Sequence, residues 1–268
     1  MPLDETSGVY FEIHGSGPPV MLGMPWFASH GEILSAEAEP AFKAFVGVLA
    51  ERYAVLAMDY PSIGKSRDLA PEKLTADRVC TDLLAVADAA GFERFAFVGY
   101  SWSAATALQL AGRTDRLSAL AIGGWPPLDG PYEAIWAAAR DRIGRVEPGA
   151  MRVLRSADQY RQWDTFYRSV VGHWDEAAVV GALRCPRMVY FGANGDLIEA
   201  GHSVPIASTI RRTRRTLEQQ GWEVVEIEDR GHEVGVEVDI VAPLIRSFLD
   251  RVLGGTAGPV ARGRAKLA

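Results

Sequence analysis

The sequence is short of cysteine, of basic charge and of long hydrophobic runs. Its only two cysteines, Cys80 and Cys185, cannot build a disulfide framework or a thiolate zinc site, and we expect both to be small buried side chains. The 28 lysines and arginines are outnumbered by 34 aspartates and glutamates, and the net charge of −6 argues against a nucleic-acid partner. No run reaches the roughly 18 consecutive apolar residues that a membrane span needs.

The composition is otherwise that of a folded protein with a substantial core. Hydrophobic residues make up 48% and charged residues 23% of the chain, which argues against a disordered or fibrous protein. A length of 268 residues is enough for one large α/β domain. The first five residues, Met-Pro-Leu-Asp-Glu, include two acids and no base, whereas a secretory leader would be basic and then apolar. We therefore expect a soluble, cytoplasmic protein that does not act at a membrane.

Short apolar runs alternate with segments of helical period along most of the chain. Strands are expected at residues 9–14, 20–22, 53–58, 94–98, 117–122, 187–191 and 222–227. Helices are expected at residues 37–50, 74–90, 103–111, 205–220 and 240–253. The turn over residues 15–19 allows the first two strands to form a hairpin. The alternation predicts parallel βαβ units in one doubly wound, mostly parallel sheet.

Residues 126–186 interrupt this alternation, because they show helical patterns and no convincing strand. An insertion of helices between two core strands can form a short lid over an active site. We expect a substrate-binding region lined by four tryptophans: Trp26, Trp125, Trp136 and Trp163. The alternative is that these rings only pack the lid onto the sheet. We expect residues 1–253 to form a single domain and residues 254–268 a disordered tail.

One buried strand runs directly into a helix at Phe97-Val-Gly-Tyr-Ser-Trp-Ser-Ala-Ala105, with Ser101 at the junction. Such a sharp turn strains the backbone and requires small neighbours, which Gly99 and Ser103 provide. The Ser101 hydroxyl would then project from the edge of the sheet at the N-terminus of the helix, where free N–H groups stabilise negative charge. This placement suits a nucleophile.

The same segment resembles the nucleophile elbow G-x-S-x-G of the α/β-hydrolase family, with Ser103 in place of the last glycine. The family's catalytic residues follow in the order Ser, Asp or Glu, His, and here Asp196 and His232 follow late strands in that order. Since parallel strands share one carboxyl edge, Ser101, Asp196 and His232 should converge. The resemblance extends over residues 9–253 and implies an α/β-hydrolase fold with a short helical lid.

The identity of the acid is open at this stage. Asp196 stands one residue further from Gly192 than the family spacing leads us to expect, and an aspartate in such a place often caps a helix instead. Glu199 lies nearby, and Asp129 follows the preceding strand, where some members of the family carry the acid. His232 itself could simply cap a loop.

The family's oxyanion hole combines two backbone N–H groups, one after the nucleophile and one from an earlier loop. The first would be that of Trp102. The loop Gly23-Met-Pro-Trp26 resembles the family's His-Gly-x-Pro loop, with Leu22 where histidine is usual, and makes Met24 the second donor. Residues 59–66 resemble the family's structural D-x-P-G-x-G-x-S loop and not a phosphate-binding loop.

These resemblances imply a serine hydrolase for a small to medium carboxylic ester, thioester or lactone, acting through an acyl-enzyme on Ser101. No cofactor and no metal is indicated, and the partner expected is a small-molecule substrate; homodimer formation is left open. Two alternatives remain at this stage. One is a carbon–carbon bond hydrolase or lyase that uses the same triad, and the other is a ligand-binding protein that keeps the fold without catalysis.

Overall fold

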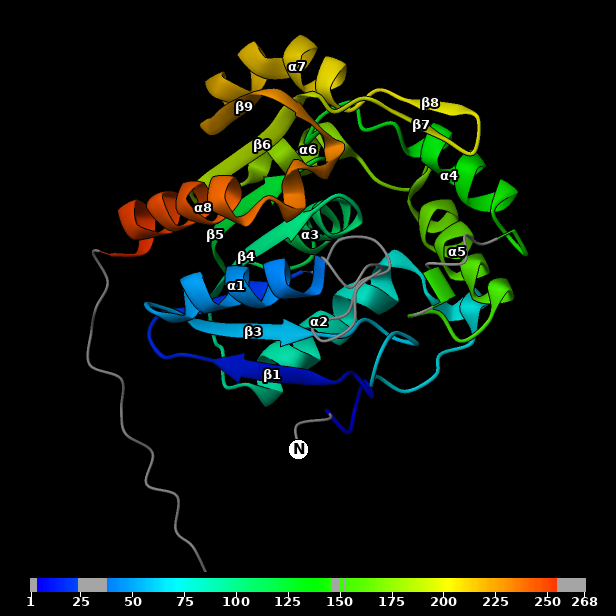
Figure 1. Cartoon of the computed structure of the whole chain (residues 1–268), viewed down its shortest axis with the longest axis horizontal. Helices are drawn as coiled ribbons and strands as arrows, with labels where there is room; N and C mark the ends of the chain where they lie inside the picture. Colours follow the sequence, from blue (N-terminus) through cyan, green and yellow to red (C-terminus); the bar gives the residue numbers. More distant parts are fainter. Residues whose placement is uncertain (1–3, 24–37, 146–149, 152, 255–268) are drawn as a thin grey trace, which may run out of the picture.

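The computed structural model describes residues 4–23, 38–145, 150–151 and 153–254 (Figure 1). Its centre is a seven-stranded sheet in the order β1-β3-β2-β4-β5-β6-β9. The strands are β1 (Phe11–His14), β2 (Pro19–Leu22), β3 (Ala54–Met58), β4 (Phe95–Tyr100), β5 (Leu117–Gly123), β6 (Arg187–Asn194) and β9 (Trp222–Gly231). Every neighbouring pair is parallel except β1 and β3. The predicted doubly wound, mostly parallel sheet is confirmed.

Helices cover both faces of the sheet, which explains the nearly continuous apolar strands. In β4, Phe95 and Phe97 belong to one buried cluster, whereas Ala96 and Val98 belong to a second cluster on the opposite face. Successive residues of a strand point to opposite faces, so a strand covered on both sides must be apolar throughout. The covering helices are α1 (Ala38–Ala50) and α8 (Val238–Leu253) on one face, and α2 (Ala76–Ala89), α3 (Trp102–Ala111) and α7 (Ala207–Gln219) on the other.

The first two strands do not form the hairpin that the sequence allowed. β1 pairs antiparallel with β3, and β2 pairs parallel with β3 on its other side, so that β3 separates them. Gly15 and Gly17 in the connection have φ values of 75° and 128°. A Cβ atom on either would collide with backbone carbonyl oxygens of residues 50–53. The connection therefore passes close under the end of α1 instead of turning back directly.

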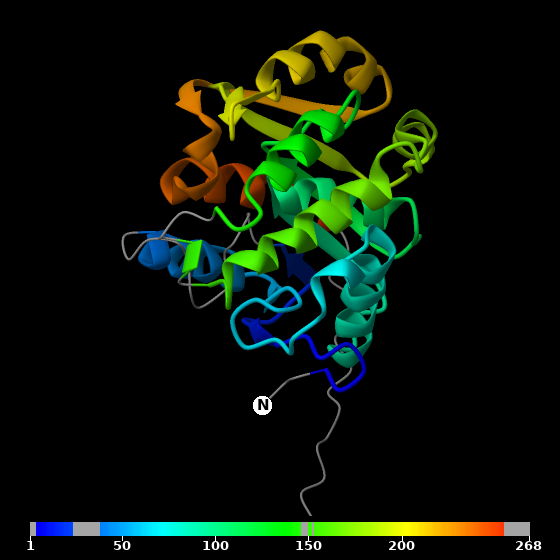
Figure 2. The same ribbon diagram turned by 90° about the vertical axis from the view of Figure 1, so that its right-hand side faces the viewer.

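The insertion between β5 and β6 consists of helices, as the sequence predicted. It contains α4 (Tyr132–Asp141), α5 (Arg161–Val170) and α6 (Glu176–Ala182), and its described residues include no strand. In Figure 1, α4 and α5 lie side by side on the right of the molecule, and Figure 2 shows them from that side. α5 buries one face that carries Trp163, Phe166 and Tyr167.

Two features near the carboxyl edge were not predicted. β6 and β9 extend past their expected ends at Phe191 and Ile227, and remain paired as far as Asn194 and Gly231. A small antiparallel hairpin, β7 (Leu197–Glu199) and β8 (His202–Val204), then precedes α7. His232 follows the extended end of β9 directly and begins the 3₁₀ turn η4 (His232–Val236).

Within the described chain, no helix combines the length and apolarity needed to cross a membrane.

Candidate active site

Ser101 occupies the strained junction that the sequence predicted. It lies between β4 and α3 with φ 56° and ψ −120°, a conformation that costs a non-glycine residue on the order of 1–3 kcal/mol. Its N–H donates to the carbonyl of Gly123, 2.8 Å away, and its own carbonyl accepts from the N–H groups of Ala104 and Ala105. A Cβ on Gly99 would lie 2.9 Å from the carbonyl oxygen of Ser103, which explains the glycine. The backbone therefore fixes the serine at the apex.

The imidazole of His232 lies beside this serine, with Nε2 2.9 Å from Ser101 Oγ. The two residues are far apart in sequence and meet because each follows a parallel strand at the same edge of the sheet. Burial lowers the pKa of His232 to about 4, and the neighbouring Glu233 carboxylate opposes this shift. At neutral pH the imidazole is therefore uncharged and able to accept the serine proton.

The other imidazole nitrogen, His232 Nδ1, is buried and finds no hydrogen-bond partner among the described residues. Asp196 is exposed, and its Oδ1 accepts a hydrogen bond from the N–H of Ser208 in the first turn of α7, 3.0 Å away. Asp196 therefore caps the first turn of α7 with its side chain, although the N-cap residue of this helix is Ile206 and not Asp196 as the alternative had it. The structure thus brings two of the three predicted residues together, and the catalytic role of Asp196 stays a prediction.

The competing acids are engaged elsewhere too. Asp129 has φ 55°, is exposed and lies 3.4 Å from Arg212. Glu199 pairs with Arg142 at 2.5 Å. Asp196 follows Asn194 by two residues, and Asn194 pairs with Gly231, the residue before His232. Of the three acids, Asp196 therefore follows the strand position nearest to His232.

Trp102 begins α3, so its N–H belongs to the first helical turn and has no acceptor within the helix. Its buried indole ring packs edge-on against Tyr60 and Phe166, with centroids 4.6 and 5.2 Å apart. The hydroxyl of Ser103, which stands where the elbow pattern has its last glycine, lies 3.1 Å from that of Tyr60 and so has a buried hydrogen-bond partner. Met24, the second predicted donor, lies outside the described residues.

Gly23, at the start of the predicted oxyanion loop, is tightly enclosed. Its N–H donates to the carbonyl of Val98, and a Cβ there would lie 2.9 Å from both the Phe97 ring and Ser103 Cβ.

We expect Gly23→Ala to destabilise the protein by about 1–3 kcal/mol, because both neighbours are fully buried. Urea unfolding measures the loss. Gly47→Ala is the matched control: nothing lies within 4 Å of its Cβ position on α1, so stability should stay equal or rise.

The predicted substrate-binding tryptophans are placed differently from one another. Trp125 and Trp163 are buried, with only 2% and 1% of their surface exposed, and pack against other aromatic rings. Trp136 is partly exposed; its Nε1 donates to Asp164, 2.8 Å away, and so joins α4 to α5. Trp26 lies outside the described residues. In this arrangement the three described rings support the inserted helices, and contact with a ligand stays a prediction.

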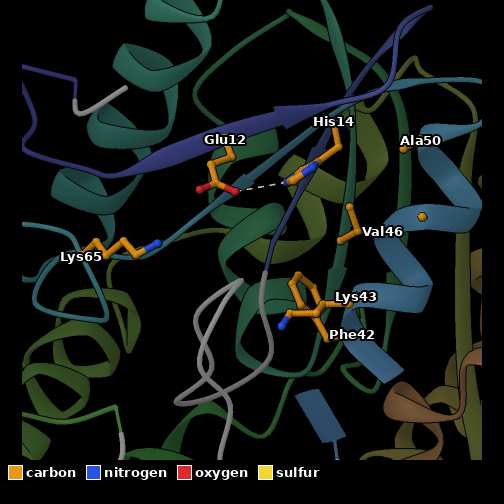
Figure 3. A pocket seen from close by; sticks show the side chains of 8 residues that line it. Glu12, His14, Phe42, Lys43, Val46, Ala50 and Lys65 are labelled. Atoms are coloured by element: carbon orange, nitrogen blue, oxygen red, sulfur yellow. Dashed lines mark ion pairs between the residues drawn. The ribbon is translucent and has the colours of Figure 1, made fainter. Parts of the chain in front are cut away.

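A hollow of about 550 Å³ lies on β1 and α1, and neither Ser101 nor His232 lines it (Figure 3). Charges of both signs surround it, and Glu12 is 3.4 Å from the imidazole of His14. The described residues that line it include no serine, threonine or cysteine beside a base. Among the residues described, no group of three or more His, Cys, Asp or Glu side chains could hold a metal ion.

Comparisons with known proteins show which family and fold the chain resembles. The sequence profile of the alpha/beta hydrolase family matches residues 13–242. A curated relative, "Putative carbamate hydrolase RutD" from Azorhizobium caulinodans, is 30% identical over 125 residues, which are 46% of this chain and 43% of that protein. The match therefore spans less than half the length of this relative.

Solved structures resemble the chain over most of its length. A thermophilic esterase from Thermogutta terrifontis superimposes with a TM-score of 0.68 at 22% identity, covering 91% of this chain and 93% of that one. The enol-lactonase from Burkholderia xenovorans LB400 gives a TM-score of 0.62 at 19% identity, covering 90% and 96%. These likenesses confirm the predicted α/β-hydrolase fold.

Proposed function

The chain belongs to the alpha/beta hydrolase family, and on that basis we propose that it is a serine hydrolase that cleaves a small to medium carboxylic ester, thioester or lactone through an acyl-enzyme on Ser101. The observation that carries this proposal is the 2.9 Å approach of His232 Nε2 to Ser101 Oγ at a strained strand-to-helix turn. The names of the esterase, the enol-lactonase and the carbamate hydrolase among the similar proteins support hydrolysis at an acyl carbon.

The proposed reaction has two halves. His232 takes the proton of the Ser101 hydroxyl while the oxygen attacks the carbonyl carbon of the substrate, giving a tetrahedral oxyanion. The N–H of Trp102, together with that of Met24, donates to this oxyanion. The protonated His232 then gives its proton to the leaving alcohol or thiol. In the second half, water gives a proton to His232 and attacks the acyl carbon. His232 then returns this proton to Ser101 Oγ as the bond between serine and acyl group breaks, which releases the acid and restores the enzyme.

Asp196 is the proposed acid that would orient the imidazole through Nδ1. A buried imidazole without a partner has a low pKa and is a weak base, whereas a neighbouring carboxylate raises the pKa and stabilises the imidazolium. Catalytic hydrogen bonds are often incomplete without substrate and tighten in the complex. We propose that Asp196 exchanges its contact with the Ser208 N–H for His232 Nδ1 in the working enzyme.

The substrate is proposed to have an apolar acyl or alcohol part, bound by the region that includes Trp26, Trp125, Trp136 and Trp163. A panel of p-nitrophenyl esters with acyl chains of increasing length, a lactone and a p-nitrophenyl carbamate tests this proposal. We expect turnover of the esters with a preference for medium chains. Turnover confined to the acetate would contradict a roomy apolar region, and turnover of the carbamate alone would move the substrate class toward the named relative.

A fluorophosphonate probe tests the acyl-enzyme chemistry without knowledge of the substrate. The wild-type protein should take up one equivalent, and mass spectrometry of the peptides should place the adduct on Ser101. A folded wild-type protein that neither reacts with the probe nor hydrolyses any member of the panel would favour the ligand-binding alternative.

A further inference from the structure

Tyr100, immediately before the serine, touches His232 in two ways. Its hydroxyl donates a hydrogen bond to the backbone carbonyl of His232, with 2.6 Å between the oxygens. Its ring lies against the imidazole, with centroids 5.2 Å apart and planes inclined by 47°. Burial raises the pKa of the Tyr100 phenol well above its usual value, so the hydroxyl keeps its proton and acts as a donor.

Three glycines enclose the ring of Tyr100. Gly123 is the last residue of β5, Gly124 follows it, and Gly235 lies in η4 beyond the histidine. A Cβ on Gly123 would lie 2.7 Å from Tyr100 Cδ2, one on Gly124 would lie 2.5 Å from Cζ, and one on Gly235 would collide with the same ring. Gly124 also has φ 62°, which favours glycine. The ring therefore occupies a slot that only residues without a side chain can form.

The slot lies at the centre of the sheet. Tyr100, Gly123 and Tyr190 are paired in register across three neighbouring strands, and the two tyrosine rings pack with centroids 5.6 Å apart. His232, by contrast, follows the edge strand β9 and stands in a 3₁₀ turn outside the sheet. Its imidazole is bonded to Ser101 through Nε2, while Nδ1 has no partner among the described residues. The hydroxyl of Tyr100 thus ties an edge turn to the centre of the sheet.

We propose that Tyr100 is a positioning residue, which holds the backbone of His232 so that Nε2 stays within reach of Ser101 Oγ. The inference rests on the proposed function, in which His232 is the base. Tyr100 does not touch the reacting atoms. It acts through the histidine, and it leaves Nδ1 open for the acid.

Tyr100→Phe tests the proposal, because it keeps the ring in its slot and removes only the hydroxyl. We expect kcat on the best ester of the panel to fall about ten- to hundredfold while KM changes less than about twofold, since a small misplacement of the base slows both proton transfers. Tyr190→Phe is the matched control. Tyr190 is also buried, on β6, which β5 separates from β4, and within the described chain its hydroxyl makes no hydrogen bond, so kcat should stay within about twofold.

A readout independent of turnover separates this proposal from the proposed function. The ring ¹⁵N signals of His232, recorded with labelled histidine, should shift or broaden in Tyr100→Phe and stay unchanged in Tyr190→Phe. If the wild-type protein does not react with the fluorophosphonate, the serine hydrolase proposal fails, and the NMR comparison still tests the positioning role.

Wild-type kcat with unchanged His232 signals in Tyr100→Phe would overturn the proposal, and so would equal losses in both variants, which would indicate general packing. Should Tyr100→Phe fail to fold, the wild-type hydroxyl is observed instead. With ζ-¹³C tyrosine in mixed H₂O and D₂O, a buried, bonded Tyr100 hydroxyl should give two resolved signals because its proton exchanges slowly. A single averaged signal would overturn the inference.

Discussion

Ser101→Ala is expected to abolish reaction with the fluorophosphonate and to lower ester turnover by at least about 10³-fold. The reason is that the hydroxyl within 2.9 Å of His232 Nε2 is the only group in the proposed mechanism that forms a covalent bond with the substrate. Burial keeps the neighbouring imidazole uncharged at neutral pH, so that it can accept a proton in the wild type and in the variant alike. The loss of activity therefore reports the missing nucleophile. Gel detection of a fluorescent probe and the p-nitrophenyl assay measure the two effects.

Ser103→Ala is the matched control, since it removes a second buried serine hydroxyl from the same turn. That hydroxyl contacts Tyr60 and not the imidazole, so the variant should lose some stability and keep its reaction with the probe. If Ser101→Ala still reacted at the wild-type rate, or if the adduct formed on Ser103, the assignment of the nucleophile would be wrong.

The meeting of Ser101 and His232 was predictable because it depends on topology. Each residue follows an apolar strand, the strands are parallel, and parallel strands end at a common edge. The covering of both faces of the sheet by helices was also predictable, because β4 is apolar at successive positions and so has no solvent-exposed face.

The pairing of the first two strands and the ends of β6 and β9 could not be predicted from the hydrophobic pattern. The sequence allowed a hairpin of β1 and β2 because both are short and joined by a turn, but the pairing partner of each proved to be β3, which comes later in the chain. β6 and β9 extend through polar and glycine-rich residues that are typical of loops, since backbone pairing at the sheet edge does not require apolar side chains.

Tyr100 was not singled out from the sequence, although it is adjacent to the nucleophile. Its place became evident only from the three glycines around its ring, which are distant from it in the sequence and meet in the fold. The acid was uncertain for a related reason. Whether Asp196 caps α7 or bonds to His232 depends on one side-chain and loop conformation, which residue spacing does not determine.

The pH dependence of stability and of kcat distinguishes an Asp196 that caps α7 from one that bonds to His232. The pKa of His232 is about 4 in the folded protein and 6.5 when unperturbed, so the unfolded chain binds this proton more tightly. The contribution of His232 to stability is therefore complete above pH 6.5 and is lost as the pH falls toward 4. For activity, an imidazole without a carboxylate at Nδ1 should remain an active base down to about pH 4, whereas engagement of Asp196 should move the acid limb of the kcat profile to higher pH.

Asp196→Asn is expected to lower kcat by about 10² to 10⁴-fold, the range for loss of the orienting carboxylate in a triad. The substitution is informative because asparagine keeps an oxygen that can accept from the Ser208 N–H, so the capping contact and the fold are retained while the charge is removed. The acid limb of kcat should also move toward pH 4 in this variant, since only the buried imidazole then sets it. Measurements of kcat from pH 4 to 9, with the melting temperature recorded in parallel, test both effects.

Asp129→Asn is the counterpart that decides between the two acids. Asparagine tolerates the positive φ of this position, and the exposed ion pair with Arg212 contributes little stability, so the variant should fold and retain kcat within about twofold. A larger loss in Asp129→Asn than in Asp196→Asn would assign the acid to Asp129, in the loop after β5. Unchanged kcat in both variants would leave Asp196 with its capping role alone and reduce the catalytic unit to Ser101 and His232. Tyr100 holds the histidine through its backbone, whereas the acid would hold it through Nδ1. If Asp196 does not act on the histidine, the double variant Tyr100→Phe/Asp196→Asn should therefore have the same kcat as Tyr100→Phe alone.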